Sequence, residues 1–139
     1  MDLATAIAGL NWVAVLLAAA CAFLIGALWY SRNLFGSTWL LEIGLTEKAY
    51  DDRNHRAAVS VATFVLQVVA AAALALFLGA GSGWRVGLQS GLIVGLCWVA
   101  TAYGITYFYE QRSLRLFMIN AGYYVVLFAA MGAIIGALS

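Results

Sequence analysis

The chain has 139 residues, of which 65% are hydrophobic and 9% are charged. A soluble domain is about a quarter charged, so this composition excludes an ordinary water-soluble domain. The net charge of +1 gives no support for a nucleic-acid partner. The length allows a single membrane-embedded domain, residues 1–139, without a separate soluble one.

Four apolar runs are long enough to cross a bilayer, which takes about 20 residues. We predict membrane helices over residues 7–30, 57–78, 86–109 and 116–138. Each run lacks Asp, Glu, Lys, Arg and His, and the chain has no proline that would break a helix. The predicted fold class is an all-α membrane protein, a bundle of four transmembrane helices whose partner is the lipid bilayer.

The connection between the first two helices is the long one. We expect a short interfacial helix in it, lying on the membrane and formed around Leu34, Phe35, Trp39, Leu40 and Ile43. Thr46 then fits an N-cap with Glu47 in the first turn, which predicts a polar extension that leads into the second span.

Aromatic and basic residues flank the predicted spans. We interpret five of them as anchors at the membrane interface: Trp29, Tyr30, Arg32, Trp39 and Trp84. The 31–56 and 110–115 connections contain six of the seven Lys and Arg residues, and the opposite end contains only Arg85. The positive-inside rule therefore predicts that both chain ends are non-cytoplasmic and that Glu110 and Arg112 mark a cytoplasmic turn.

Small residues recur every four positions in two of the spans. The third contains Gly87, Gly91 and Gly95, and the first contains Ala18, Ala22 and Gly26. This spacing places them on one ridge of a helix, where missing side chains allow a close approach of a second backbone. The pattern predicts helix packing, either within the chain or between two copies.

Polar side chains occur in the half of the bundle that is predicted to be cytoplasmic. The candidate ligand-binding residues are Thr63, Gln67, Thr101, Tyr103, Asn120 and Tyr124. One hypothesis is a site for a neutral or amphipathic ligand. The alternative is hydrogen bonding between helices that holds the bundle together, which is favoured because no ionisable carboxylate joins the group.

Catalytic and metal-binding patterns are not found. The sequence has no nucleophile–base pairing, phosphate loop or paired carboxylates within the spans, so we expect no enzyme activity, no catalytic residues and no cofactor. Cys21 and Cys97 are expected to be buried free thiols. His55 beside Asp51 and Asp52 offers too few ligands for a defined metal site.

Two motifs carry a family resemblance. The first is Gly26-x-x-Trp29-Tyr30-Ser31 followed by Leu34-Phe35-Gly36-x-x-Trp39, and the second runs from Tyr109 to Tyr124 as YEQRSLRLFMINAGYY. Together they resemble a family of small bacterial four-helix membrane proteins of unknown function. Gln111 stands where that family commonly has Gly, and Tyr124 where His is frequent. The resemblance implies four spans and an inner-membrane location, and it supplies no activity.

Two hypotheses for the function follow. The first is a small ligand-binding or permeation protein that acts as a homo-oligomer. The second is a non-transporting accessory or structural subunit of a larger membrane complex. The first hypothesis requires that the polar residues enclose a cavity, whereas under the second they bond to one another.

Overall fold

A computed structural model describes residues 2–46 and 53–139 of the chain. These residues form helices and no β-strand. The elements are α1 (Leu3–Ala8), α2 (Trp12–Trp29), α3 (Gly36–Ile43), α5 (Arg53–Leu78), α6 (Trp84–Ile93), the π-helix η1 (Val94–Ala100), α7 (Thr101–Tyr109) and α8 (Leu114–Leu138).

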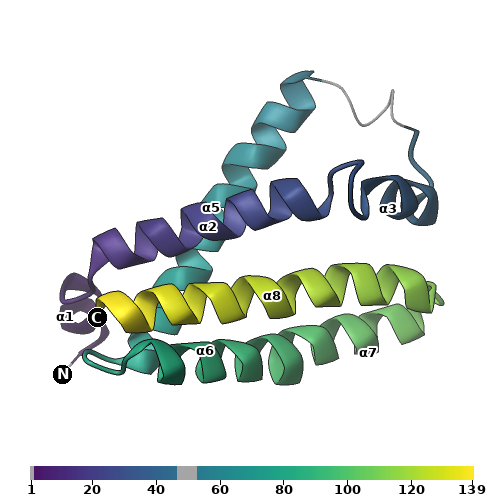
Figure 1. Ribbon diagram of the computed structural model, residues 1–139. Coiled ribbons are helices and arrows are strands. Elements are labelled where there is room, and N and C mark those ends of the chain that lie inside the picture. Colours follow the sequence, from purple (N-terminus) through teal and green to yellow (C-terminus); the bar gives the residue numbers. More distant parts are fainter. Residues whose placement is uncertain (1, 47–52) are drawn as a thin grey trace.

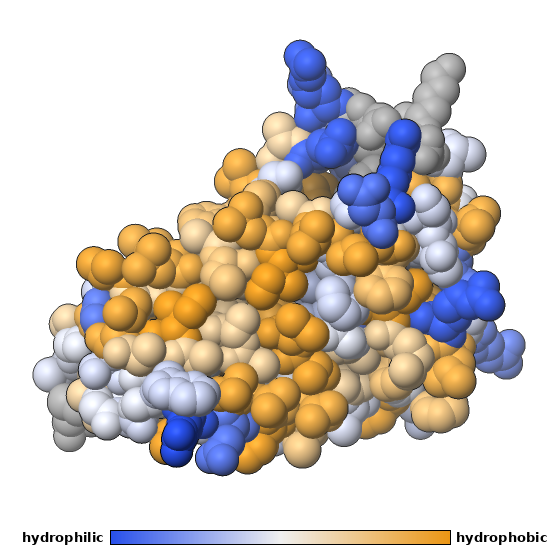
Figure 2. Space-filling view, viewed as in Figure 1, coloured by the Kyte–Doolittle hydropathy of each residue, from blue (hydrophilic) through white to orange (hydrophobic). Residues whose placement is uncertain are grey.

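Four helical segments are long and apolar enough to cross a membrane: Trp12–Trp29, Arg53–Leu78, Trp84–Tyr109 and Leu114–Leu138. Apolar side chains cover the middle of the molecule, and hydrophilic side chains gather toward its ends (Figure 2). Leu24, Leu66 and Phe77 are among the large side chains that these helices expose, as expected where lipid takes the place of water. The prediction of an all-helical multi-pass membrane protein with four spanning helices is confirmed.

The helix α8 is the centre of the bundle. The α6–η1–α7 helix runs antiparallel along one side of α8, and α2 packs along another side (Figure 1). The helix α5 crosses α2 obliquely, and its first turns extend away from the other helices (Figure 1). Both chain ends lie at one end of the bundle, and α3 and the α7–α8 turn lie at the other (Figure 1). The core contains Val15, Leu127, Met131 and Ile135.

The predicted start of the first span, at Ile7, is wrong. The chain forms the separate helix α1, which ends at Ala8 with Gly9 as its C-cap, and α2 begins only at Trp12. The cause is Asn11, whose side-chain oxygen accepts a hydrogen bond of 3.2 Å from the Ala14 backbone N–H. An asparagine N-cap of this kind begins a new helix with a new axis.

The short helix after the first span is present as α3. The chain reverses tightly before it, because the Phe35 N–H donates to the Trp29 carbonyl at 3.0 Å and the Gly36 N–H to the Ser31 carbonyl at 2.9 Å. A side chain at Gly36 would overlap the carbonyl oxygen of Tyr30. Gly36 is therefore required by this close approach of backbone to backbone.

Two other predictions concern the segment after α3. Thr46 lies outside any helix, and α5 begins at Arg53. The predicted N-cap role of Thr46 depends on Glu47 and the residues after it, and Glu47, Asp51 and Asp52 lie outside the described residues.

The third span contains a feature that the sequence did not predict. Its residues 94–100 form a π-helix, which accommodates one extra residue relative to an α-helix. In a regular α-helix, residues 91 and 107 would lie about 160° apart around the axis. The extra residue turns the later part of the helix back by about 100°, so that both Gly91 and Tyr107 meet α8.

Candidate functional site

The two motif stretches pack against each other where α2 ends. The Trp29 indole Nε1–H donates to the Ile119 carbonyl at 2.9 Å, and the Tyr30 hydroxyl donates to Oδ1 of Asn120 at 2.7 Å. The Asn120 amide Nδ2 in turn donates to the Tyr107 hydroxyl at 2.7 Å. Residues about 90 positions apart in the sequence therefore form one hydrogen-bonded unit, which we call the motif junction.

Glycines bring the helices of the motif junction close together. A Cβ atom at Gly26 would lie 2.8 Å from the Tyr123 hydroxyl oxygen, and one at Gly122 would lie 3.3 Å from the Trp29 ring. Gly26 of the first motif thus faces an aromatic residue of the second, and Gly122 of the second faces an aromatic residue of the first. This is the pattern expected where small residues make room for large side chains between membrane helices.

Gln67 of α5 extends the motif junction into the centre of the bundle. Its Nε2 donates to the Tyr123 hydroxyl at 2.9 Å, and this hydroxyl lies 3.5 Å from the Ala22 carbonyl oxygen on α2. Gln67 is 6% exposed, and its Oε1 has no hydrogen-bond partner among the described residues. A buried amide oxygen without a donor is costly in a membrane protein, because hydrocarbon supplies none.

Five tyrosines surround these hydrogen bonds. The Tyr123 ring lies with its centroid 5.3 Å from Tyr30 and 5.0 Å from Tyr124, in edge-to-face arrangements. Tyr103 stacks on Tyr124 with centroids 5.2 Å apart, and it meets Tyr107 edge-on at 5.5 Å. These separations are those of favourable aromatic pairs. We call this group the tyrosine cluster.

The structure brings four of the six candidate ligand-binding residues together: Gln67, Tyr103, Asn120 and Tyr124. Thr63 is half-buried one turn before Gln67, and the hydrogen bonds of the motif junction do not include it in the described part of the chain. The placement of Thr101 was wrong. It is exposed, and its hydroxyl donates to the carbonyls of Cys97 at 2.7 Å and Trp98 at 2.9 Å, within its own helix.

Four residues of the site have roles that sequence reasoning missed. Tyr123 and Tyr107 were not among the candidates, although both have polar tips in the predicted spans. Tyr30 was interpreted as an interface anchor with Trp29, and both side chains instead point into the bundle and bond to α8. The second motif contains Tyr123, and this was the one indication available in the sequence.

The other predicted anchors are less enclosed. Trp84 is 53% exposed at the start of α6, and Arg32 is exposed after α2. The Trp39 ring of α3 meets Tyr30 edge-on, with centroids 5.0 Å apart. The short helix α3 is therefore attached to the tyrosine cluster.

The predicted glycine ladder, Gly87, Gly91 and Gly95, lies against α8. A side chain at Gly87 would overlap the Gly132 carbonyl oxygen, and one at Gly91 would overlap the Phe128 carbonyl oxygen. A Cβ at Gly95 would be 2.8 Å from the Val125 Cα. The ladder is filled within the chain and is not free to join a second copy.

The small residues of the first span face the core as well. Ala18 and Ala22 are fully buried at 0% exposure, in the cluster that also contains Leu127 and Met131. They and Gly26 allow α2 to lie close to α8.

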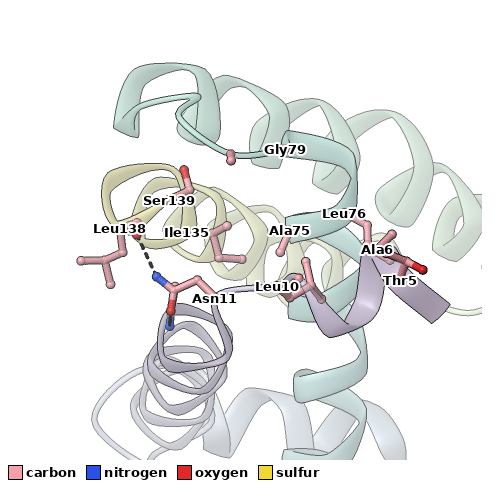
Figure 3. A pocket seen from close by; sticks show the side chains of 13 residues that line it. Thr5, Ala6, Leu10, Asn11, Ala75, Leu76, Gly79, Ile135, Leu138 and Ser139 are labelled. Carbon is pink, nitrogen blue, oxygen red and sulfur yellow. Dashed lines mark hydrogen bonds between the residues drawn. The ribbon is translucent and has the colours of Figure 1, made fainter. Parts of the chain in front are cut away.

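A pocket of about 440 Å³ lies at the opposite end of the bundle, where the chain ends meet. Its walls come from α1, the start of α2 and the ends of α5 and α8, and Leu10, Ala75 and Ile135 point toward its centre (Figure 3). Asn11 closes one side by donating from Nδ2 to the Leu138 carbonyl at 2.8 Å. We call it the terminal pocket.

The α7–α8 turn is held by polar contacts. Arg112 Nε donates to Glu110 Oε2 at 2.7 Å, and this hydrogen bond raises the pKa of Arg112. The Ser113 hydroxyl donates to Glu42 Oε2 of α3 at 2.5 Å and also accepts from the Leu116 N–H at 3.0 Å, which caps α8. The turn is thus tied to α3.

Gln111 in the same turn adopts a φ of 55°, in the left-handed region. Glycine reaches this region without a steric penalty, whereas a residue with a Cβ is strained there. Glycine at position 111 would therefore avoid a strain that Gln111 bears.

Comparison with known proteins identifies the family and adds no chemistry. No curated protein and no solved structure matches the chain. The family model described as "Protein of unknown function (DUF1761)" matches residues 13–136, which include both motifs and all but the outermost residues of the four spanning helices. The chain belongs to this DUF1761 family of proteins of unknown function.

Proposed function

We propose that the chain is a non-enzymatic membrane protein that binds a small, uncharged amphipathic molecule in the terminal pocket. The observation that carries the proposal is the pocket itself. Its volume of about 440 Å³ lies in the range of sites for small molecules, which are mostly apolar with a few polar groups. Ala14, Ala75 and Ile135 supply the apolar wall, and Thr5, Asn11 and Ser139 supply polar groups.

The lining residues define the class of ligand. None of the residues that line the pocket has a charged side chain, so no side chain there would compensate an ionic ligand in a site beside the hydrocarbon layer. A hydroxyl or carbonyl group of the ligand could instead exchange hydrogen bonds with Thr5 or Ser139. This favours an uncharged molecule with one polar end.

The polar residues first considered for the ligand do not support permeation. Tyr30, Asn120 and Tyr107 bond to one another, and Gln67 bonds to Tyr123. Such mutual bonding holds helices together and occupies these polar groups, apart from Oε1 of Gln67, which has no partner among the described residues. Binding in a pocket of a single chain is therefore the simpler proposal, and a homo-oligomer through the glycine ladder is not needed for it.

The mutual bonding also favours a second candidate function, an accessory or structural subunit of a membrane complex. A rigid bundle of this kind would present its surface to another protein, and its interior would serve only stability. Under this alternative the terminal pocket would retain no ligand.

We place the protein in the bacterial inner membrane with both chain ends on the non-cytoplasmic side. Arg32 and Arg112 belong to the connections at one end of the bundle, Arg115 lies in the first turn of α8 at the same end, and Arg85 lies at the other end. This distribution supports the orientation through the positive-inside rule.

Native mass spectrometry of the purified protein, released gently from detergent, tests the proposal. We expect the wild type to retain a copurified small molecule in a fixed ratio. Ala6→Trp should abolish the retention, because Ala6 lines the pocket from α1 and an indole there would fill it. Ala4→Trp is the matched control, since Ala4 is on the same helix, is exposed and does not line the pocket.

Two results would contradict binding in this pocket. One is a wild-type protein that carries no small molecule, above all if a second protein copurifies with it, which supports the accessory-subunit alternative. The other is equal retention in Ala6→Trp and Ala4→Trp, which would place the ligand elsewhere.

A further inference from the structure

A groove opens between α7 and α8 at the turn that joins them, far from the terminal pocket (Figure 1). Its volume is about 190 Å³. The residues that matter here are Gly104, Leu114 and Phe117 along its length and Tyr107, Arg112 and Ser113 at its mouth.

The length of the groove is apolar. Gly104 has no side chain, and a Cβ there would lie 3.4 Å from the Phe117 ring, so the missing side chain leaves a slot beside this ring. Phe108 and Leu114 flank the slot and are 87% and 74% exposed. Since both belong to the ends of spanning helices, the slot faces the acyl-chain region just below the lipid headgroups.

The mouth of the groove carries charges of both signs. The Arg112 guanidinium lies over the Tyr107 ring, with its central carbon 5.9 Å from the ring centroid. Its Nε is bonded to Glu110, and the side chain is 45% exposed; the four N–H groups on its two terminal nitrogens take no part in this hydrogen bond. Glu42 reaches the mouth through its hydrogen bond with Ser113, at 2.5 Å. The turn and its contact with α3 thus contain one guanidinium, paired with Glu110, and a second carboxylate, Glu42, bonded to the neighbouring Ser113.

We infer that this groove binds a zwitterionic phospholipid with a primary ammonium, that is, a phosphatidylethanolamine. Its phosphate would pair with Arg112, its ammonium with Glu42 or Glu110, and the upper part of one acyl chain would occupy the slot beside Gly104. Guanidinium groups suit phosphate oxygens through several N–H donors.

The two carboxylates decide between headgroups. A phosphatidylglycerol offers Arg112 the same phosphate, and it brings no cation to balance Glu42 and Glu110. A free phosphate lacks the acyl chain that the slot would hold. Charge complementarity at the mouth therefore selects the zwitterionic lipid.

The test is native mass spectrometry of the full chain, incubated with equal amounts of phosphatidylethanolamine and phosphatidylglycerol that have identical acyl chains. We expect phosphatidylethanolamine to be retained several-fold more often. Arg112→Gln should lower its retention at least fivefold, and Gly104→Leu should do the same by filling the slot. Arg85→Gln is the matched control, because Arg85 also lies over an aromatic ring, 5.4 Å from the Trp84 centroid, without lining this groove.

Glu42→Gln separates this site from a merely basic patch. It removes one carboxylate and should shift the preference toward phosphatidylglycerol without loss of total lipid bound. Ala6→Trp, which fills the terminal pocket, should leave lipid retention unchanged, so the two proposals fail independently.

The inference is overturned if the two lipids are retained equally by the wild type, or if Arg112→Gln retains as much phosphatidylethanolamine as Arg85→Gln. Because Arg112 is at the surface of a turn, its substitution is compatible with folding, and a melting temperature measured alongside shows this. If Gly104→Leu alone proves unstable, the Arg112 and Glu42 variants still decide the question.

Discussion

The Gln67 amide of α5 donates one hydrogen bond of 2.9 Å to the Tyr123 hydroxyl of α8, and the other polar atom of the same amide is buried without a partner in the part of the chain that the structure describes. The contact joins α5 to α8 inside the bundle. Only one of the two polar atoms of the amide is satisfied. Burial of the unpaired oxygen costs desolvation free energy, which offsets part of what the hydrogen bond contributes.

Substituting the two partners should have opposite effects. Tyr123→Phe removes the acceptor and orphans Nε2 of Gln67 as well, so the free energy of unfolding should fall by about 1–2 kcal/mol. Gln67→Met keeps the length of the side chain and removes both amide atoms, so it should be neutral or stabilising. Reversible unfolding in sodium dodecyl sulfate measures both.

A double variant serves as the control for this pair. Once Gln67 is Met, the added change Tyr123→Phe should cost clearly less than it does in the wild type, because no amide remains to be orphaned. Gln67→Met could instead lower the free energy of unfolding more than Tyr123→Phe does. The amide oxygen would then have a partner in the membrane, such as a bound water or ligand, and Gln67 would serve to bind it.

Adding one methyl group at the contact between α6 and α8 should destabilise the protein. Gly91→Ala would drive a Cβ into the Phe128 carbonyl oxygen, and a backbone atom cannot rotate away as a side chain can. We expect a loss of about 1–3 kcal/mol in the free energy of unfolding, as for other overpacked sites.

Gly104→Ala is the matched control for this glycine. It is on the same spanning helix, and its Cβ would meet the Phe117 ring at 3.4 Å, an ordinary contact. Its stability should change by less than half of the loss seen for Gly91→Ala. Equal losses at the two positions would mean that helix propensity, and not the approach of α8, accounts for the effect.

Gln111→Gly should stabilise the protein although it removes a side chain. The left-handed φ of 55° costs a residue with a Cβ about 1–2 kcal/mol. Glycine avoids that strain. It also lowers the free energy of unfolding by about 0.5–1 kcal/mol, because it gives the unfolded chain more conformational freedom. We therefore expect a net gain of about 0.5–1 kcal/mol, measured by the same unfolding titration.

Gln111→Ala provides the comparison for this prediction. Alanine keeps the Cβ and hence the strain, so it should give no gain. Should Gly and Ala at this position be equally stable, the backbone of the turn is not strained in the membrane.

The proposed orientation predicts which ends of the bundle can be reached from outside the cell. In a background with Cys21 and Cys97 replaced by Ala, a cysteine at Ser139 should react with a membrane-impermeant maleimide on intact cells. A cysteine at Ser37, which is exposed at the start of α3, should react only after the membrane is permeabilised. The reverse pattern would show that the basic connections face outward.

The four spanning helices could be predicted because each is a long uncharged apolar run, and such a run has few alternatives to a membrane helix. The break before α2 was missed because hydropathy is averaged over a window, whereas Asn11 acts through a single hydrogen bond of 3.2 Å. A polar residue with capping ability inside an apolar run was the available indication.

The candidate site was predicted less well, because the sequence did not show the direction in which each side chain points around its helix axis. Counting at α-helical spacing placed Thr101 with the polar group, whereas the π-helix over Val94–Ala100 changes the phase of every later residue in that span. Tyr103 reaches Tyr124 while Thr101 points outward. Tyr30 and Tyr107 were missed because the sequence does not show which way an aromatic residue near a helix end will point.

The π-helix has a consequence for insertions and deletions. Deleting one residue from the stretch 94–100 would turn the third spanning helix into a regular α-helix. The residues after the deletion would then rotate by about 100° around the helix axis. The glycine contacts of α6 would survive, whereas Tyr103 and Tyr107 would leave α8, and the motif junction would lose its third helix. The additional residue in this helix therefore matters because it sets the rotation of all later residues around the helix axis, whichever side chain it has.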